Sequence, residues 1–340
     1  MIPSILQAAG RSIRISIENS DALTYRSDVL ALKYAQELFG VDKAAVEAMR
    51  QSSSDPVSLL PSVGKSLLLP TAGQLEPLQV LFVGVPPLYQ FRYLEMRQFS
   101  QTVLTVLARK APLTRSLALT VHGPNYGLDE IECFRAILAG LLDQLASGDF
   151  PAQLEHIAIV ELKKRRADRF VNELNQLLRT RELIVDPQGA AKLELGANAA
   201  ERMRVAGYSS ESKPLIFVAM PFREDMADYY HYGILGATQK AGFLCERADQ
   251  SHFTGDILDW VKRRIDAGTI LLADLTFSNP NVYLEVGYAW GRGKRTLLLV
   301  RDSGELQFDV RGQRSIVYRR IKDLEELLSV ELEALKASRP

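Results

Sequence analysis

Short apolar runs alternate with amphipathic stretches along the first half of the chain. Strict apolar–polar alternation at 13–17 predicts a half-buried strand. Continuous apolar runs predict further strands at 28–33, 81–85, 116–121 and 157–161. Helical periodicity is present at 92–108, 129–147 and 165–178. Strands that alternate with helices predict an α/β domain with a mostly parallel sheet.

The same alternation restarts in the second half. The predicted strands are 215–220, 243–246, 269–274 and 295–300, and the predicted helices are 228–241, 256–267 and 280–291. Gly242 directly follows the first of these helices, where glycine is a favoured C-terminal cap. The sequence therefore predicts an α/β fold with two Rossmann-like domains, the second a compact parallel, flavodoxin-like sheet.

The pattern decays between residues 179 and 212, where Gly, Ala and Ser are frequent. Weak patterning with small and polar residues is typical of a connection between domains. We therefore predict a first domain over 1–195, a linker over 196–212 and a second domain over 213–335.

Composition narrows the possible functions. At about 150 residues per domain, 340 residues fit two domains. Lys and Arg number 41 and so do Asp and Glu, and this zero balance argues against a nucleic-acid partner. Cys133 and Cys245 lie far apart, with no zinc or disulfide spacing. Because neither a signal peptide nor an apolar run of membrane-spanning length is found, we expect a cytoplasmic protein without a membrane partner.

Polar and aromatic residues follow the strands predicted in the second domain. In parallel sheets the carboxyl ends of the strands meet at one edge, where ligands bind. Carboxylates, amides, hydroxyls, an arginine and aromatic rings would gather there, a mixture that suits a ribose and a base. The candidate substrate-binding residues are Met220, Pro221, Phe222, Arg247, Asp249, Asp274, Thr276, Asn279, Asn281 and Tyr283.

Glu285 is the candidate catalytic residue. It lies on the short helix predicted at 280–291, and Gly287 and Gly291 would let that helix approach the sheet closely. A carboxylate facing a ligand at this edge could attack or stabilise an oxocarbenium-like sugar centre. The alternative is a solvated glutamate, or one that pairs with Arg292. Trp260 and Trp290 fall at apolar helix positions and are expected in the core.

Four segments of the second domain carry a resemblance to a known superfamily. They are Phe217–Phe222 (FVAMPF), Gly255–Ile257 (GDI), Ala273–Thr276 (ADLT) and Asn279–Ala289 (NPNVYLEVGYA). Together they resemble the nucleoside 2-deoxyribosyltransferase-like superfamily, which is related to TIR domains, over about residues 213–302. The last segment is the most specific of the four.

The resemblance implies an N-glycosidase or NAD nucleosidase-type hydrolase, or a glycosyl transferase. Glu285 falls on the family's catalytic carboxylate, and an acidic residue on the preceding helix, Asp256 or Asp259, would donate a proton. NAD or another nucleotide would be the substrate, with no cofactor and no metal. The resemblance also implies a homo-oligomer and a gated role in bacterial antiphage defence. The alternatives are a transferase or nucleotide hydrolase of salvage, and a non-enzymatic nucleotide sensor or assembly module.

The first domain has one informative stretch, 120–130, in which a strand is followed by a glycine-containing loop and an acidic helix start. Such loops can bind phosphate. Here Asp129 and Glu130 already satisfy the helix dipole, which lowers the need for an anionic ligand. The order of elements is similar to that of macro domains, which bind ADP-ribose-type ligands. Both a scaffold and a sensor of a nucleotide signal stay open for this domain.

Overall fold

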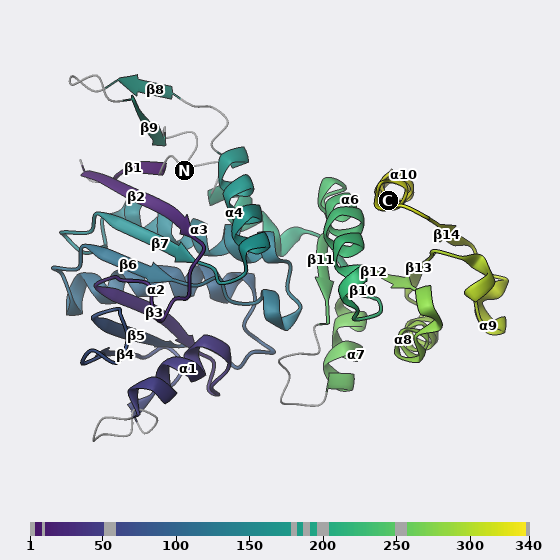
Figure 1. Cartoon of the computed structure of the whole chain (residues 1–340), viewed down its shortest axis with the longest axis horizontal. Coiled ribbons are helices and arrows are strands. Elements are labelled where there is room, and N and C mark those ends of the chain that lie inside the picture. The colour runs from purple at the N-terminus through teal and green to yellow at the C-terminus, as the bar shows by residue number, and fades with distance from the viewer. Residues whose placement is uncertain are drawn as a thin grey trace. The chain divides into compact units, whose positions relative to one another are not determined.

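The computed structural model describes residues 4–8, 11–50, 59–177, 182–185, 191–195, 204–248 and 257–337 (Figure 1). The chain divides into two compact units, each of which is described by itself. The first unit comprises Met1–Pro124 and Glu130–Glu211, and the second comprises Asn125–Asp129 and Ser212–Pro340. Both are built from alternating strands and helices, so the predicted fold class is confirmed. The predicted domain and linker boundaries stay a prediction.

The first unit contains a mixed sheet of order β4-β5-β3-β6-β7-β2-β1-β9-β8. Its strands are β1 (Ser4–Ala8), β2 (Arg11–Glu18), β3 (Val29–Tyr34), β4 (Ser66–Pro70), β5 (Gln79–Gly84), β6 (Ser116–Leu119), β7 (His156–Val160), β8 (Glu182–Val185) and β9 (Ala191–Leu195). The five central strands from β5 to β2 run parallel. Strands β4, β1 and β8 each pair antiparallel with a neighbour, so the sheet is less uniformly parallel than predicted.

Four α-helices accompany this sheet: α1 (Gly40–Met49), α2 (Tyr93–Lys110), α3 (Glu130–Ser147) and α4 (Lys164–Leu177). Strands β3 and β5 are almost fully buried because helices cover both faces, which explains their continuous apolar sequence. Helices α2 and α3 pack closely at Gly140, where an added Cβ would lie 2.2 Å from the Arg97 carbonyl oxygen. Residues 204–208 are also helical, and Arg204 pairs with Asp143 of α3 at 2.8 Å.

The second unit contains a five-stranded, all-parallel sheet of order β11-β10-β12-β13-β14. Its strands are β10 (Leu215–Ala219), β11 (Leu244–Arg247), β12 (Ile270–Asp274), β13 (Arg295–Val300) and β14 (Ser315–Val317). Counted within this unit, the strand order is 2-1-3-4-5, which is the flavodoxin-like order. The predicted parallel, flavodoxin-like sheet is therefore confirmed.

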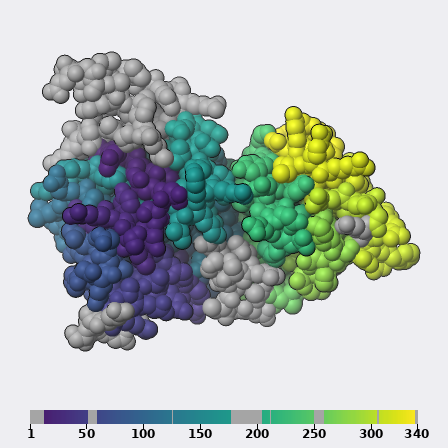
Figure 2. All heavy atoms as spheres, viewed as in Figure 1, coloured from purple at the N-terminus to yellow at the C-terminus, as the bar shows by residue number. Residues whose placement is uncertain are grey.

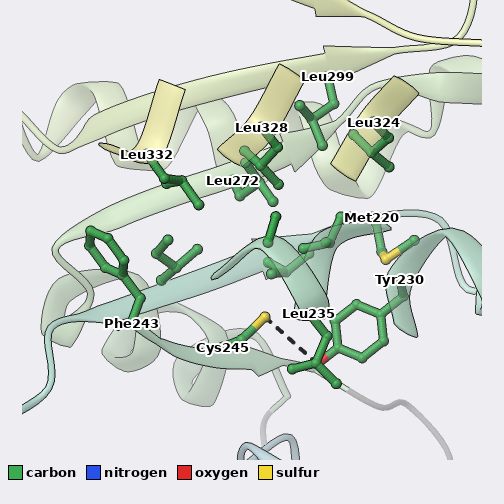
Figure 3. Close-up of a cluster of buried hydrophobic side chains, with 14 of the residues drawn as sticks. Met220, Tyr230, Leu235, Phe243, Cys245, Leu272, Leu299, Leu324, Leu328 and Leu332 are labelled. Atoms are coloured by element: carbon green, nitrogen blue, oxygen red, sulfur yellow. Dashed lines mark hydrogen bonds between the residues drawn. The ribbon is translucent and has the colours of Figure 1, made fainter. Parts of the chain in front are cut away.

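One face of this sheet packs against a π-helix, η5 (Tyr229–Leu235), the short α6 (Gly236–Lys240) that continues it, and α10 (Ile321–Ala337). Leu324, Leu328 and Leu332 recur every four residues along α10 and are fully buried. Figure 3 shows them directed at Leu272 and Leu299 of the strands. In Figure 2 the yellow C-terminal segment, which includes α10, lies on the surface of the second unit.

The other face packs against α7 (Ile257–Ala267) and α8 (Pro280–Gly291). Trp260 of α7 is buried against Phe217 of β10, as predicted, with ring centroids 6.0 Å apart. Trp290 of α8 is 39% exposed, so its predicted core position is wrong. The buried face of α8 is formed by Val282, Val286 and Ala289, and Trp290 lies beside that face.

The segment Asn125–Asp129 completes the second unit along the outer edge of β11. The Arg247 backbone N–H donates to the Gly127 carbonyl at 2.9 Å, and the Cys245 N–H donates to Asp129 Oδ2 at 3.1 Å. Residues two apart in a strand direct their N–H groups to the same side. This segment therefore satisfies the backbone donors that β11 would otherwise leave unpaired.

Within the described ranges, no helix is both long enough and apolar enough to cross a membrane. Among the same residues, no cluster of His, Cys, Asp and Glu could hold a metal ion. Cys133 and Cys245 are both buried, and neither forms a disulfide bond.

Candidate functional site

The candidate site is the carboxyl edge of the sheet in the second unit. Strand β10 lies between β11 and β12, so the chain order reverses at the boundary of β10 and β12. The segment after β10 leads to η5 on one face, and the segment after β12 leads to α8 on the other face. Ligands of open α/β sheets bind at such switch points. The predicted site residues follow these strands.

Helix α8 positions Glu285. The helix begins at a standard cap, in which the Asn279 side chain accepts a hydrogen bond from the Asn281 N–H at 3.0 Å and Pro280 occupies the first turn. The side chain of Glu285 flanks the face formed by Val282 and Val286 and is half-buried. Burial raises the pKa of its carboxyl group to about 7. No hydrogen bond or ion pair joins Glu285 to another residue that the structure describes.

The alternative partner of Glu285 is engaged elsewhere. Arg292 pairs with Asp266 of α7, with 2.9 Å between Nε and Oδ1, and Tyr288 donates to the same carboxylate at 2.9 Å. Pairing of Glu285 with Arg292 is therefore wrong as an interpretation. A Cβ added at Gly287 or Gly291 would meet no atom within 4 Å. The expectation that these glycines permit a close approach of α8 to the sheet is also wrong.

Asp274 and Thr276 form a buried network at the end of β12. Tyr318 donates from its hydroxyl to Asp274 Oδ2 at 2.5 Å, and the Thr276 N–H donates to Asp274 Oδ1 at 3.0 Å. Thr276 Oγ1 in turn accepts from the Arg301 N–H at 3.2 Å. Burial raises the pKa of Asp274, opposed by these hydrogen bonds. These hydrogen bonds fix the backbone of the connection between β12 and α8.

The segment after β10 carries Met220, Pro221 and Phe222. Met220 and Pro221 are buried, whereas Phe222 is 40% exposed. Arg247, at the end of β11, lies with its guanidinium carbon 4.0 Å from the centre of the Tyr230 ring and 5.9 Å from that of Phe222. Its Nη1 is 3.6 Å from Met220 Sδ. The structure thus brings Met220, Phe222 and Arg247 together.

The remaining predicted residues are placed as follows. Asn279 and Asn281 form the start of α8, with Asn281 exposed. Tyr283, on α8, packs against the hydrophobic core, and its hydroxyl accepts a hydrogen bond from the Gln307 N–H at 3.2 Å. Asp259 is exposed in the first turn of α7. Asp249 and Asp256 lie outside the described residues.

Sequence reasoning missed two arginines and a strained turn at this edge. Arg223, after β10, lies over the ring of Phe277 at 4.2 Å, and Arg301, after β13, lies over the ring of Tyr229 at 5.0 Å. Phe277 and Ser278 both have positive φ, 66° and 48°. The two arginines follow strand ends, and that position was the signal available in the sequence.

The stretch singled out in the first domain contains a buried histidine. Burial, and then the positive charge of Lys33, holds the pKa of His122 well below its ordinary value, so the ring is neutral at pH 7. Lys33 at the end of β3 pairs with Asp42 of α1, with 2.5 Å between Nζ and Oδ2, and both side chains are almost fully buried. Phe99 packs edge-on against His122, with centroids 5.4 Å apart.

The sequence matches no protein-family model and no curated protein. Solved structures similar to this chain include macrodomains. One is a mutant macrodomain from Oceanobacillus iheyensis, 14% identical, with a TM-score of 0.41, covering 53% of this chain and 99% of that one. A second, the same organism's macrodomain with ADP, is 16% identical, with a TM-score of 0.40, covering 52% and 96%. A macrodomain from Trypanosoma brucei in complex with ADP is 16% identical, with a TM-score of 0.37, covering 48% and 68%.

Proposed function

We propose that the second unit cleaves the N-glycosidic bond of NAD or another nucleotide, with Glu285 as the catalytic carboxylate. The state of Glu285 carries this proposal. Its carboxyl group is half-buried on α8, the helix that follows β12 of the switch point, has no bonding partner among the described residues, and has a pKa raised to about 7. A structural carboxylate is normally paired when it is buried. An unpaired one at this place is suited to a cationic reaction centre that arrives with the substrate.

The chemistry follows from charge. The C1′–N bond breaks and its electron pair leaves with the base, so positive charge develops on the ribose. The ionised carboxylate of Glu285 stabilises that charge or bonds to C1′. Water then supplies a hydroxyl group to C1′ and releases a proton. Asp256 or Asp259 stays the candidate proton donor to a leaving base that needs one. Tyr318 and the Thr276 N–H each donate to one oxygen of Asp274, so Asp274 stays a candidate for substrate binding and not for proton donation.

A second function shares the same first step. In a deoxyribosyl transferase the sugar bound to Glu285 passes to another base, and in a nucleotide hydrolase of salvage it passes to water. The products therefore distinguish these enzymes from an NAD nucleosidase. A non-enzymatic sensor or assembly module would bind nucleotide without any product. The raised pKa of Glu285 favours the enzymatic functions, since a binding module has no use for a costly unpaired carboxylate.

Glu285→Gln tests the proposal. The amide keeps the shape of the side chain and removes the charge, so turnover should fall by about 10²-fold or more while substrate binding persists. The matched control is Glu333→Gln, the same change at an exposed position of α10. Purified proteins are incubated with NAD and a panel of nucleotides, and products are separated and quantified. If Glu285→Gln turns over every substrate as fast as the parent protein, the proposed mechanism is wrong.

The role of the first unit is part of the same proposal. A constitutive NAD hydrolase would deplete its host, so the activity needs a gate. The first unit would bind a nucleotide signal or act as a scaffold for a homo-oligomer, within a bacterial defence response. Lys33, which pairs with Asp42, lies at the end of β3, and the neutral His122 follows β6. Such a signal would bind at the carboxyl ends of these parallel strands.

A further inference from the structure

Two arginines flank the switch point of the second unit. Arg247 ends β11 and Arg301 directly follows β13, and these strands lie on the two sides of the central pair β10 and β12. With strands about 4.8 Å apart, β11 and β13 are separated by about 14 Å. An anionic group bound over β10 and β12 would therefore have a guanidinium group on each side.

Both side chains leave the sheet on the same face. Cys245 and Leu299 lie two residues before Arg247 and Arg301, and both belong to the core cluster that packs against η5 and α10. Side chains two apart in a strand share a face. The aromatic contacts support this shared face. The Arg247 guanidinium lies 4.0 Å from the ring centre of Tyr230, and the Arg301 guanidinium lies 5.0 Å from that of Tyr229, the neighbouring residue of η5. A stacked arginine is fixed in place and keeps its N–H edge available for hydrogen bonds.

No described carboxylate is in direct contact with either guanidinium group, although the positive charge of Arg301 helps to lower the pKa of Asp225 and opposes the rise in the pKa of Asp274. Arg247 and Arg301 are half-buried, and neither forms an ion pair or a hydrogen bond with a described carboxylate. Three other arginines of this unit do pair with carboxylates: Arg223 with Asp225, Arg292 with Asp266 and Arg320 with Asp323. Partly buried charge is costly when it is unpaired. Two such charges on one face of a ligand edge indicate that an anion arrives with the ligand.

We propose that Arg247 and Arg301 bind the phosphate group of the substrate, which makes the substrate class 5′-phosphorylated nucleotides, including dinucleotides, rather than free nucleosides. This inference rests on the proposed function, because it assigns the ligand of the same site. Phosphate oxygens accept the paired N–H donors of arginine. The base and the ribose would then lie toward α8, where Glu285 is placed.

The experiment compares adenosine, adenosine 5′-monophosphate and NAD as substrates. We expect kcat/KM for the phosphorylated substrates to exceed that for adenosine at least 10²-fold. Arg247→Met and Arg301→Met keep much of the alkyl chain and remove the charge. Each should lower kcat/KM at least tenfold for the phosphorylated substrates and by a clearly smaller factor for adenosine. Arg247→Lys should recover part of the loss, since lysine keeps the charge without the paired donors.

Arg97→Met is the matched control, because the Arg97 guanidinium also lies 4.0 Å over a tyrosine ring, that of Tyr208 in the first unit. It should leave all three kcat/KM values unchanged. Equal kcat/KM for adenosine and its monophosphate would overturn the inference, as would equal losses for both substrates in the Met variants. Cleavage of nucleosides alone would overturn the inference and leave the proposed function standing.

Binding gives a readout that does not depend on turnover or on the variants' folding. Isothermal titration of the parent protein with adenosine and with adenosine 5′-monophosphate is carried out at low and high salt. The phosphate site is supported if the monophosphate binds more tightly than adenosine, and if salt weakens and inorganic pyrophosphate competes with that binding. If this result is obtained but no substrate is cleaved, the proposed function is wrong and the phosphate site still stands. Equal, salt-independent binding of the two ligands would overturn the inference.

Discussion

At the scale of single residues, three carboxyl groups of the second unit differ in pKa and in hydrogen bonding because their surroundings differ. Asp266 is held by Arg292 and Tyr288, and the Arg292 hydrogen bond lowers its pKa. Asp274 is fully buried and its pKa is raised by burial, yet two donors hold its oxygens. The carboxyl group of Glu285 is partly buried, and no described residue donates a hydrogen bond to it. Of the three, Glu285 alone combines a raised pKa with free oxygens, which a group that meets a cation requires.

The pH dependence of activity follows from that pKa. In the proposed mechanism Glu285 acts as a carboxylate, so the free protein would be competent only when this group is ionised. With a pKa of about 7, kcat/KM should rise as pH increases from about 5.5 and level off above about 8. A rate that falls through pH 7 would instead assign Glu285 as an acid. The profile is measured with a substrate whose own ionisation is constant over this range.

The same pKa predicts the stability of Glu285→Gln. Folding raises the pKa from 4.5 to about 7, so the folded state binds the proton more tightly and stability falls as pH rises between these values. Glutamine removes that cost. The variant should nearly match the parent at pH 4.5 and exceed it at pH 8 by about 1–3.5 kcal/mol, the upper figure being the pKa difference of about 2.5 at about 1.4 kcal/mol per unit. Thermal unfolding at both pH values checks this, and a variant less stable at pH 8 would show a structural role.

The sequence could single out Glu285 as a candidate because its position follows from one motif and one predicted helix. It could not identify the partners of α8. Arg292 lies seven residues after Glu285 and predicts a pairing along the helix, yet the structure pairs Arg292 with Asp266 of α7. Contacts between helices depend on how they pack on the sheet, which a local pattern does not contain. Trp290 was misplaced for the same reason, since an apolar residue beside the buried stripe can remain exposed.

At the scale of elements, the turn between β12 and α8 is the most constrained part of the site. Phe277 and Ser278 adopt left-handed backbone conformations, which cost non-glycine residues roughly 1 kcal/mol or more each. The turn is held by Arg223, which covers the Phe277 ring, and by the Asp274–Thr276–Tyr318 network. Strain of this kind persists where surrounding contacts fix it, and here it fixes the start of α8, the helix that carries Glu285.

Tyr318→Phe tests the network. Loss of the hydroxyl leaves the buried Asp274 carboxylate with fewer donors, which should cost about 1.5–3 kcal/mol. Because burial raises the pKa of Asp274, protonation relieves the unmet charge and the loss should be larger at pH 8 than at pH 5. Tyr229→Phe is the control, since its hydroxyl makes one long contact of 3.4 Å with the Arg319 carbonyl oxygen. Urea unfolding measures both variants, and equal losses would exclude a special role for Tyr318.

The sequence predicts helices and strands correctly where hydrophobic runs are long, and it misses strands at the edges of the sheets. The central strands of both sheets and most helices were predicted within a few residues. Strand β4 was missed because it is an edge strand whose side chains are half-exposed and which ends at Pro70. Strand β14 is three residues long, too short to show a period. Beyond Val300 no element was predicted, although the leucines of α10 recur at helical spacing.

At the scale of the whole molecule, the second unit is assembled from two separated stretches of chain. Asn125–Asp129 comes from between β6 and α3, and the rest begins at Ser212. Along β11 this short stretch accepts hydrogen bonds from the Cys245 and Arg247 N–H groups. Open strand edges promote unwanted pairing, and covering them is a common protection. The sequence pattern could not reveal this arrangement, because nothing local connects residue 127 to residue 247.

Gly127 is the residue on which this edge depends. Its φ is +82°, and an added Cβ would lie 2.3 Å from the Arg247 carbonyl oxygen and 2.8 Å from the Trp260 ring. Gly127→Ala must therefore displace backbone as well as adopt a disfavoured conformation, and we expect a loss of more than about 2 kcal/mol. Gly293→Ala is the matched control, because Gly293 has φ +66° with open space around it. Gly293→Ala should lower the free energy of unfolding by about 1 kcal/mol, which is the cost of the left-handed backbone conformation alone.

Tryptophan fluorescence measures this difference directly, because both tryptophans of the chain, Trp260 and Trp290, lie in the second unit. Unfolding followed by fluorescence should shift to lower temperature in Gly127→Ala by clearly more than in Gly293→Ala. The Arg247 guanidinium is carried by the same strand end, so loosening the edge should also weaken nucleotide binding in Gly127→Ala and leave it intact in Gly293→Ala. Equal shifts in the two variants would mean that Asn125–Asp129 does not support β11, and that the second unit needs only the chain from Ser212 onward.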